Sequence, residues 1–82
     1  MTLLPEPLGT MMDMAIARAI RNNGLPPTEP GEAGDYQLRR MAQDIWNRIG
    51  SDRRNRARAL REVPVTESEI VAHIREISVQ NG

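Results

Sequence analysis

The sequence has no cysteine, no lysine and no phenylalanine, and it has a single histidine. Without cysteine there is no disulfide, and with one histidine there is no zinc site of the usual cysteine and histidine types. The same absences remove thiolate nucleophiles and Schiff-base lysines from the possible chemistry. We therefore expect a protein that is not an enzyme and that holds no cofactor and no metal ion.

Long apolar runs and phosphate-binding glycine loops are also missing. No stretch approaches the roughly 18 apolar residues of a membrane span, and Gly31 and Gly34 lie in a proline-rich segment rather than between a strand and a helix. Residues 1–9 have no basic region and contain two prolines, which is unlike a signal peptide. The lack of cysteine fits a reducing compartment. These features predict a cytoplasmic protein without a membrane partner.

What is present suits one small helical domain, residues 1–82. A chain of this size buries a thin core, and without a disulfide or a metal it depends on good helix packing or on oligomerisation. No segment alternates with the two-residue period of a strand. Apolar residues recur instead at helical spacing. The expected fold is all-α, a small bundle of about four short helices.

The first third of the chain predicts an extended arm, a helix and a linker. Two prolines favour an extended backbone over residues 1–9. Thr10 is placed to cap a helix over residues 11–22. The proline- and glycine-rich residues 24–34 then predict an irregular linker between the first and second helices. A linker of this length allows the first helix to pack either on its own chain or on a neighbouring subunit.

Two further helices are expected in the middle of the chain. Asp35 is placed to cap the first of them, over residues 36–49, whose apolar residues follow the helical period throughout. The second covers residues 53–63, and Pro64 stops it. The apolar side of this second helix is expected to contain Ala59, Leu60 and Val63.

The last helix has the clearest start signal. Thr66 and Glu69 have the spacing of a capping box, which predicts a helix over residues 67–79. His73 lies beside its apolar face, with Glu69 and Glu76 as neighbours. These three residues could hold a metal only together with a second copy. The ordinary interpretation, which we adopt, is a histidine at the core rim paired with a carboxylate.

Arginine is concentrated in the middle of the chain, although the formal net charge is zero. Residues 36–65 carry eight arginines against three acidic residues. In the helix expected over residues 53–63, three guanidinium groups fall on one line and a fourth lies beside them. They are Arg54, Arg58 and Arg61, with Arg53 beside them. Such a row suits the carboxylates of a protein or the phosphates of a nucleic acid, and it is also compatible with an ordinary solvated face.

Two other groups are candidate contact residues. Trp46, the only tryptophan, lies at the edge of an apolar stripe with Arg39 two turns before it, and the pair extends the arginine row. The methionine-rich first helix suggests self-association, because methionine adapts to irregular surfaces. Loose filling of the core is the alternative. The self-association candidates are Met11, Met12, Met14 and Ile16.

These features favour a non-enzymatic interaction module that binds a larger protein with an acidic surface and regulates or inhibits it, as an accessory protein of bacterial or phage type. We expect it to act as a homodimer. The partner-binding candidates are Arg39, Trp46, Arg53, Arg54, Arg58 and Arg61. A DNA- or RNA-binding regulator is the first alternative, disfavoured by a sequence pI of about 6.6 and by the lack of aromatic residues among the arginines. A self-assembling structural protein is the second alternative.

Overall fold

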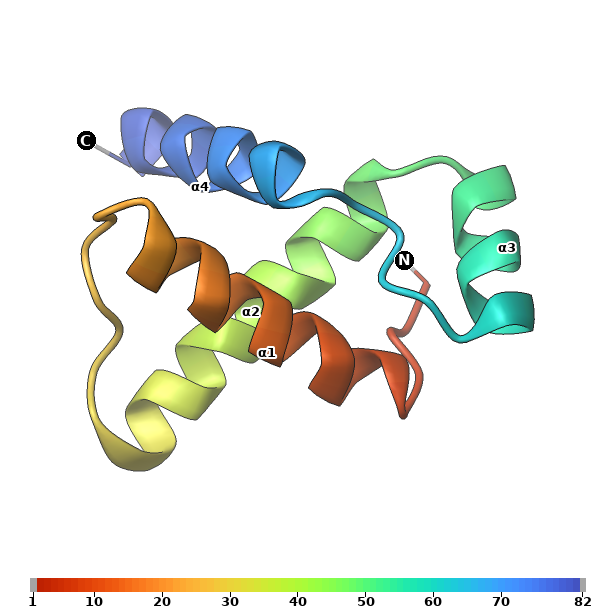
Figure 1. Ribbon diagram of the computed structural model, residues 1–82, viewed down its shortest axis with the longest axis horizontal. Coiled ribbons are helices and arrows are strands. Elements are labelled where there is room, and N and C mark those ends of the chain that lie inside the picture. The colour runs from red at the N-terminus through yellow and green to blue at the C-terminus, as the bar shows by residue number, and fades with distance from the viewer. Residues whose placement is uncertain (1, 82) are drawn as a thin grey trace.

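Four helices make up the regular structure in a computed structural model that describes residues 2–81, with side chains for residues 2–77 (Figure 1). In chain order they are α1 (Leu8–Asn22), α2 (Gly31–Arg48), α3 (Ser51–Leu60) and α4 (Glu67–Asn81). No strand occurs in this range, so the predicted all-α fold is confirmed. None of the four helices is both long enough and apolar enough to cross a membrane.

Helices α1, α2 and α4 pack on one another and enclose the core (Figure 1). At its centre are Met12 and Ile16 from α1, Ile45 and Trp46 from α2, and Ile70 from α4, all shielded almost completely from solvent. Within α1, Met12 and Ile16 are one turn apart and therefore face the same way. Burial of this apolar surface is the main force that holds the three helices together. The first helix thus packs on its own chain.

The start of α1 differs from the prediction. The helix begins at Leu8 rather than at residue 11, and Pro7 is its N-cap residue. Thr10 lies inside the first turn, and its hydroxyl donates to Glu6 Oε2 at 2.6 Å instead of capping the helix. Leu8 is buried, and this burial anchors the extra turn. The predicted arm is shortened accordingly.

The remaining arm is held against α2 by one glutamine. Gln43 Nε2 donates to the Thr2 carbonyl at 2.7 Å, and Gln43 Oε1 accepts from the Leu4 N–H at 3.0 Å. One side-chain amide therefore contacts the backbone of two residues of the arm. Leu4 is buried in the core, whereas Leu3 is exposed. The arm is thus docked by one apolar side chain and two hydrogen bonds.

The start of α2 also differs from the prediction. The helix begins at Gly31 with Pro30 as the N-cap residue, so the predicted cap at Asp35 is wrong. The connection between α1 and α2 covers residues 23–30 rather than 24–34. The proline and glycine content of residues 24–34 predicted a linker, although the last four of these residues are helical.

Gly34 shows why glycine occurs inside this helix. It is buried in α2, and a Cβ at this position would lie 1.7 Å from the Glu29 carbonyl oxygen. The preceding connection therefore approaches the helix so closely that no side chain fits between them. Gln37 strengthens the approach, because its Oε1 accepts from the Glu29 N–H at 2.8 Å. Gly34 serves close packing here rather than flexibility.

The boundaries and the buried side of α3 also require correction. The helix starts at Ser51 and ends at Leu60, because Arg61 adopts the left-handed conformation (φ 54°, ψ 51°) that stops a helix. The predicted apolar side is not the buried one. Ala59 and Leu60 are exposed, and Ala57 is buried instead.

The start of α4 agrees with the prediction. The Thr66 N–H donates to Glu69 Oε1 at 2.9 Å, and the Glu69 N–H donates to Thr66 Oγ1 at 3.2 Å. These reciprocal bonds confirm the capping box. The helix continues to Asn81 rather than ending at residue 79.

Candidate functional site

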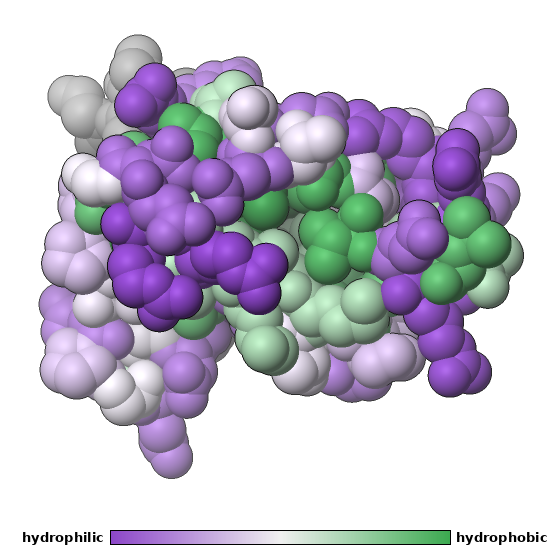
Figure 2. Space-filling model, viewed as in Figure 1, coloured by the Kyte–Doolittle hydropathy of each residue, from purple (hydrophilic) through white to green (hydrophobic). Residues whose placement is uncertain are grey.

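Helix α3 is the least embedded of the four. It lies to one side of the others in Figure 1, and Ala57 is its one buried residue. Figure 2 shows mostly hydrophilic side chains over this end of the molecule, with an apolar group among them. A ten-residue helix with so little apolar contact is not stable by itself in water. Polar contacts to the other helices must hold it in place.

Arg54 joins α3 to the C-terminal end of α2. Its Nη1 donates to the Trp46 carbonyl at 3.0 Å and also to the Ile49 carbonyl. Carbonyls at the end of a helix lack intrahelical partners and carry partial negative charge. The guanidinium group satisfies two of these carbonyls at once. Arg54 therefore positions α3 and is not part of a free arginine row.

Arg53 joins α3 to the start of α4. Its Nη1 and Nη2 donate to the two carboxylate oxygens of Glu69 at 3.0 and 2.9 Å, and Nη2 also donates to the Pro64 carbonyl. The bonds from Arg53 and from the Thr66 N–H lower the pKa of Glu69 to about 2. The hydrogen bonds between Arg53 and Glu69 raise the pKa of Arg53 above its ordinary value. The pair is therefore fully charged at neutral pH.

Arg58 lies over the ring of Trp46. The guanidinium carbon is 5.7 Å from the ring centroid, which is within the range of a cation–π contact. Arg58 also donates to Asn55 Oδ1. Trp46 is fully buried, so it is a core residue and not a partner-binding residue at the edge of the apolar stripe. Part of the burial of Trp46 comes from α3, and the apolar pattern of α2 alone does not predict this contact.

Arg39 belongs to a different cluster. Its Nη2 lies 2.9 Å from Asp13 Oδ2 and its Nη1 lies 3.0 Å from Glu6 Oε1. The hydrogen bond to Asp13 is the main reason why the pKa of Arg39 is raised. The hydrogen bond from Thr10 is the main reason why the pKa of Glu6 is lowered. Arg39 of α2 thus binds both the turn before α1, through Glu6, and α1 itself, through Asp13. It does not form a common contact surface with the buried Trp46.

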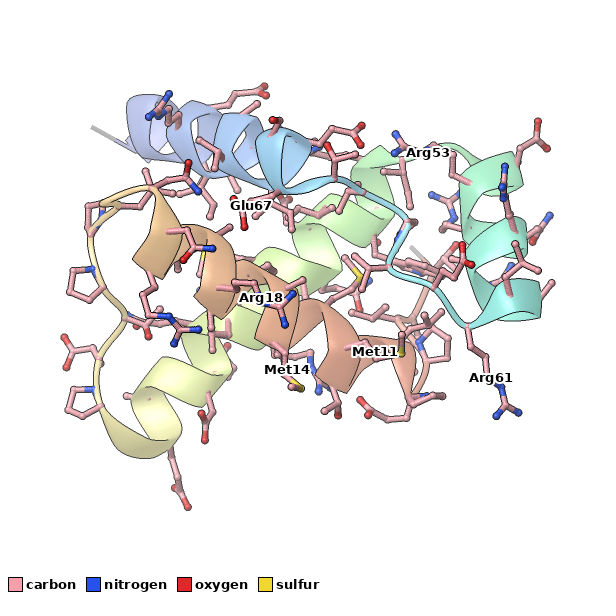
Figure 3. The ribbon with its side chains drawn as sticks, in the orientation of Figure 1. Met11, Met14, Arg18, Arg53, Arg61 and Glu67 are labelled. Atoms are coloured by element: carbon pink, nitrogen blue, oxygen red, sulfur yellow. The ribbon has the colours of Figure 1, made fainter. Side chains whose placement is uncertain are left out.

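A smaller group of side chains remains at the outer side of α3. We call it the α3 surface. Leu60 is 52% exposed. Arg56 and Arg61 are exposed and form no ion pair with any residue in the described part of the chain. Figure 3 shows Arg61 pointing away from the body of the protein. The α3 surface consists of Arg56, Leu60 and Arg61, whereas Arg58 lies on the other flank of the helix, over Trp46.

A shallow depression of about 300 Å³ borders this surface. Arg53 and Arg56 form one side of it, and Val63 and Val65 contribute apolar area. Its volume is at the lower limit of small-molecule pockets.

The four self-association candidates do not share one surface. Met12 and Ile16 are buried in the core, so they cannot contact a second chain. Met11 is partly buried, and Met14 is 60% exposed. Of the four, Met14 is therefore the residue that is most available for an interface, because Met11 packs against the core.

His73 has neither the metal partners nor the carboxylate partner considered from the sequence. Glu69 pairs with Arg53, and Glu76 pairs with Arg48 at 3.1 Å. The buried Nδ1 of His73 has no hydrogen-bond partner among the described residues. Over the same residues, no three potential metal ligands come together.

Arg56 and Leu60 are the surface residues that reasoning from sequence did not select. The buried side of this helix was predicted wrongly because it was assigned from Leu60 and Val63. Ala57 was the available signal, because a small apolar residue between arginines permits close approach to a neighbouring helix.

Comparison with protein families, with curated proteins and with solved structures finds no match to this chain.

Proposed function

We propose that the protein is a non-enzymatic interaction module that binds an acidic surface of a larger protein through the α3 surface and thereby regulates or inhibits it. The partner class is the one expected from the sequence, but the contact residues are revised. Arg53 and Arg54 position the helix, and Trp46 supports it from below. The contacts themselves come from the α3 surface.

The backbone of Arg61 is the observation that carries this proposal. Arg61 is the one non-glycine residue with positive φ in the part of the chain that the structure describes. Glycine is the usual residue at such a helix end, since a side chain there costs roughly 1 kcal/mol. The exposed guanidinium group forms no ion pair within residues 2–77 that would offset this cost. A strained residue whose side chain stabilises nothing else in the fold is characteristic of a functional position.

Three features favour an acidic protein over a nucleic acid as the partner. Leu60 lies among the cations and offers an apolar contact, which suits a protein interface better than a phosphate backbone. Trp46 is buried and cannot stack on a base. After Arg53 and Arg54 are assigned to holding the helix, the surface has fewer cations than the roughly 6–10 phosphate contacts of a typical nucleic-acid binder.

The proposed mechanism is occupation of the partner's surface. Guanidinium groups pair with carboxylates in a two-point geometry, which fixes the orientation of the bound protein. Complementary charge raises the association rate and excludes partners of the wrong charge. The bound module then covers the acidic surface and blocks its other uses. A homodimer would present two α3 surfaces to such a target.

Capture from the producing cells tests this proposal. The tagged protein is incubated with a nuclease-treated lysate, bound proteins are identified by mass spectrometry, and a purified partner is titrated by calorimetry. The Arg56→Gln and Arg61→Gly variants each remove one free cation. We expect the double variant to bind the partner about tenfold more weakly, since arginines are frequent interface hot spots. Arg75→Gln, which removes an exposed arginine of α4, is the matched control.

Two results would contradict the proposal. One is a partner that binds the double variant and the natural chain equally well. The other is the loss of all captured material on nuclease treatment, together with a steep fall in binding as salt is raised, which would instead indicate a nucleic acid.

A further inference from the structure

The outward face of α1 exposes a methionine side chain, Met14, that the core does not use. Met14 is 60% exposed, whereas Met11 beside it is only partly exposed and packs against the core, and Figure 3 labels both on this helix. Figure 2 shows apolar side chains over this part of the molecule, with hydrophilic side chains on either side. Ala17 is small and partly exposed, so another helix can approach closely.

Opposite charges lie at the two ends of this face. Arg18 and Arg21 follow the methionines, are exposed, and form no ion pair with any described residue. Glu6 precedes them, and its side chain is 56% exposed although it contacts Arg39. From the turn before α1 to the end of the helix, the order on this face is therefore acidic, apolar, basic.

We infer that a second copy of this chain binds along this face in the antiparallel direction, with Met14 at the twofold axis. Residues equally far before and after Met14 then face each other. Arg21 of one copy is placed opposite Pro7 of the other, next to Glu6, and Arg18 is placed opposite Thr10. The acidic end of each face therefore meets the basic end of the other.

Charge excludes the alternative orientation. A parallel arrangement would put the arginines of one copy against the same arginines of the other, and like charges at that spacing repel. The antiparallel arrangement also opposes the dipoles of the two helices favourably. Because a twofold interface uses the same face on both copies, it closes at two copies and does not extend into a filament. This dimer does not use the α3 surface, so it is independent of the proposed function.

The interface is small, because it rests on one helix from each copy. Interfaces below about 1,200 Å² in total are typical of weak, reversible association. We therefore expect a dissociation constant of roughly 10–100 µM. Dimer and monomer would both be present at concentrations that are convenient for measurement.

Cysteine trapping tests the arrangement. Because the natural chain has no cysteine, each variant carries a single thiol. The Met14→Cys variant places one thiol at the proposed axis, where it meets its own copy. The Tyr36→Cys variant is the matched control, since Tyr36 is an equally exposed apolar residue of α2, at 65%. In a glutathione buffer, we expect the Met14→Cys variant to form a disulfide-linked dimer at least about ten times faster than the control, because disulfide formation needs close Cβ atoms.

Sedimentation equilibrium of the natural chain provides a second measurement. The average mass should rise from 9.2 kDa towards twice that value as concentration increases. Arg21→Glu should raise the dissociation constant at least about tenfold, since it places two carboxylates together, and Arg75→Glu should not change it. A chain that stays monomeric at about 500 µM would overturn the inference. So would equal trapping rates for the two cysteine variants, or a dimer that Arg21→Glu leaves unchanged.

Discussion

Two parts of this protein are held together by different forces. Helices α1, α2 and α4 meet through buried apolar side chains such as Ile16, Ile45 and Ile70. Helix α3 contributes one buried alanine and is held by guanidinium groups on carbonyls, on a carboxylate and on an indole ring. Apolar burial is insensitive to direction and charge, whereas the contacts of α3 depend on both.

The difference supports the proposed location of the binding surface. An element held by a few polar contacts opens at lower free energy than the core, and binding surfaces are commonly drawn from such elements. The arginines of α3 are therefore divided between two tasks. Arg53 and Arg54 hold the helix, and Arg56 and Arg61 are presented to solvent. Mutations can separate these tasks from each other and from the core.

The largest expected effect is in the core. Ile16→Ala removes a fully buried side chain and should lower the free energy of unfolding by about 3 kcal/mol. Met14→Ala removes a side chain of similar size from the exposed side of the same helix and should change it by less than about 0.5 kcal/mol. Urea unfolding monitored by circular dichroism measures both. Similar losses in the two variants would contradict the assignment of Ile16 to the core.

Removing a polar anchor of α3 should have a smaller and more local effect. Arg54→Ala deletes the hydrogen bonds to the Trp46 and Ile49 carbonyls, which should cost about 1.5 kcal/mol. We expect amide hydrogen exchange to accelerate mainly within α3, because the other helices keep their apolar contacts. Arg56→Ala, two residues further along the same helix and without such a bond, is the control. Uniform acceleration over all four helices would show that α3 is part of the core after all.

The sequence predicted the apolar body better than it predicted the site, for a physical reason. Helical periodicity and the Thr66–Glu69 capping box are local patterns, and local patterns fixed the fold class and the start of α4. Whether an arginine is free depends on partners far along the chain. Arg53 meets a carboxylate 16 residues later, and Arg54 meets a carbonyl 8 residues earlier. No spacing rule within α3 contains that information.

The contact between α3 and α4 should depend on pH, because Glu69 carries it, together with the capping box of α4. The pKa of Glu69 is about 2 in the folded protein and near the ordinary value of 4.5 when unfolded. A lowered folded pKa stabilises the protein above pH 4.5, and this contribution disappears as pH falls towards 2. Glu69→Gln keeps an acceptor for the capping box but removes the charge. The natural chain should be more stable than this variant by about 1 kcal/mol at pH 7, allowing for solvent screening.

At pH 2 the difference between the natural chain and the Glu69→Gln variant should nearly vanish. Urea unfolding of both chains across this range measures it. A difference that stays constant from pH 7 to pH 2 would mean that the ion pair with Arg53 does not contribute through its charge.

The smallest expected effect has the opposite sign. Arg61 ends α3 in the left-handed conformation, where glycine avoids the clash between Cβ and the backbone. Arg61→Gly should therefore raise the free energy of unfolding, by about 0.5 kcal/mol once the greater freedom of glycine in the unfolded chain is included. Arg56→Gly, inside the same helix, should lower it by about 1 kcal/mol. Thermal unfolding of the two variants measures both changes.

A protein that becomes more stable and binds its partner less well when Arg61 is replaced would show that this arginine serves binding rather than folding. A loss of stability on Arg61→Gly would instead show that the side chain supports the fold and that the left-handed backbone at Arg61 is not strained.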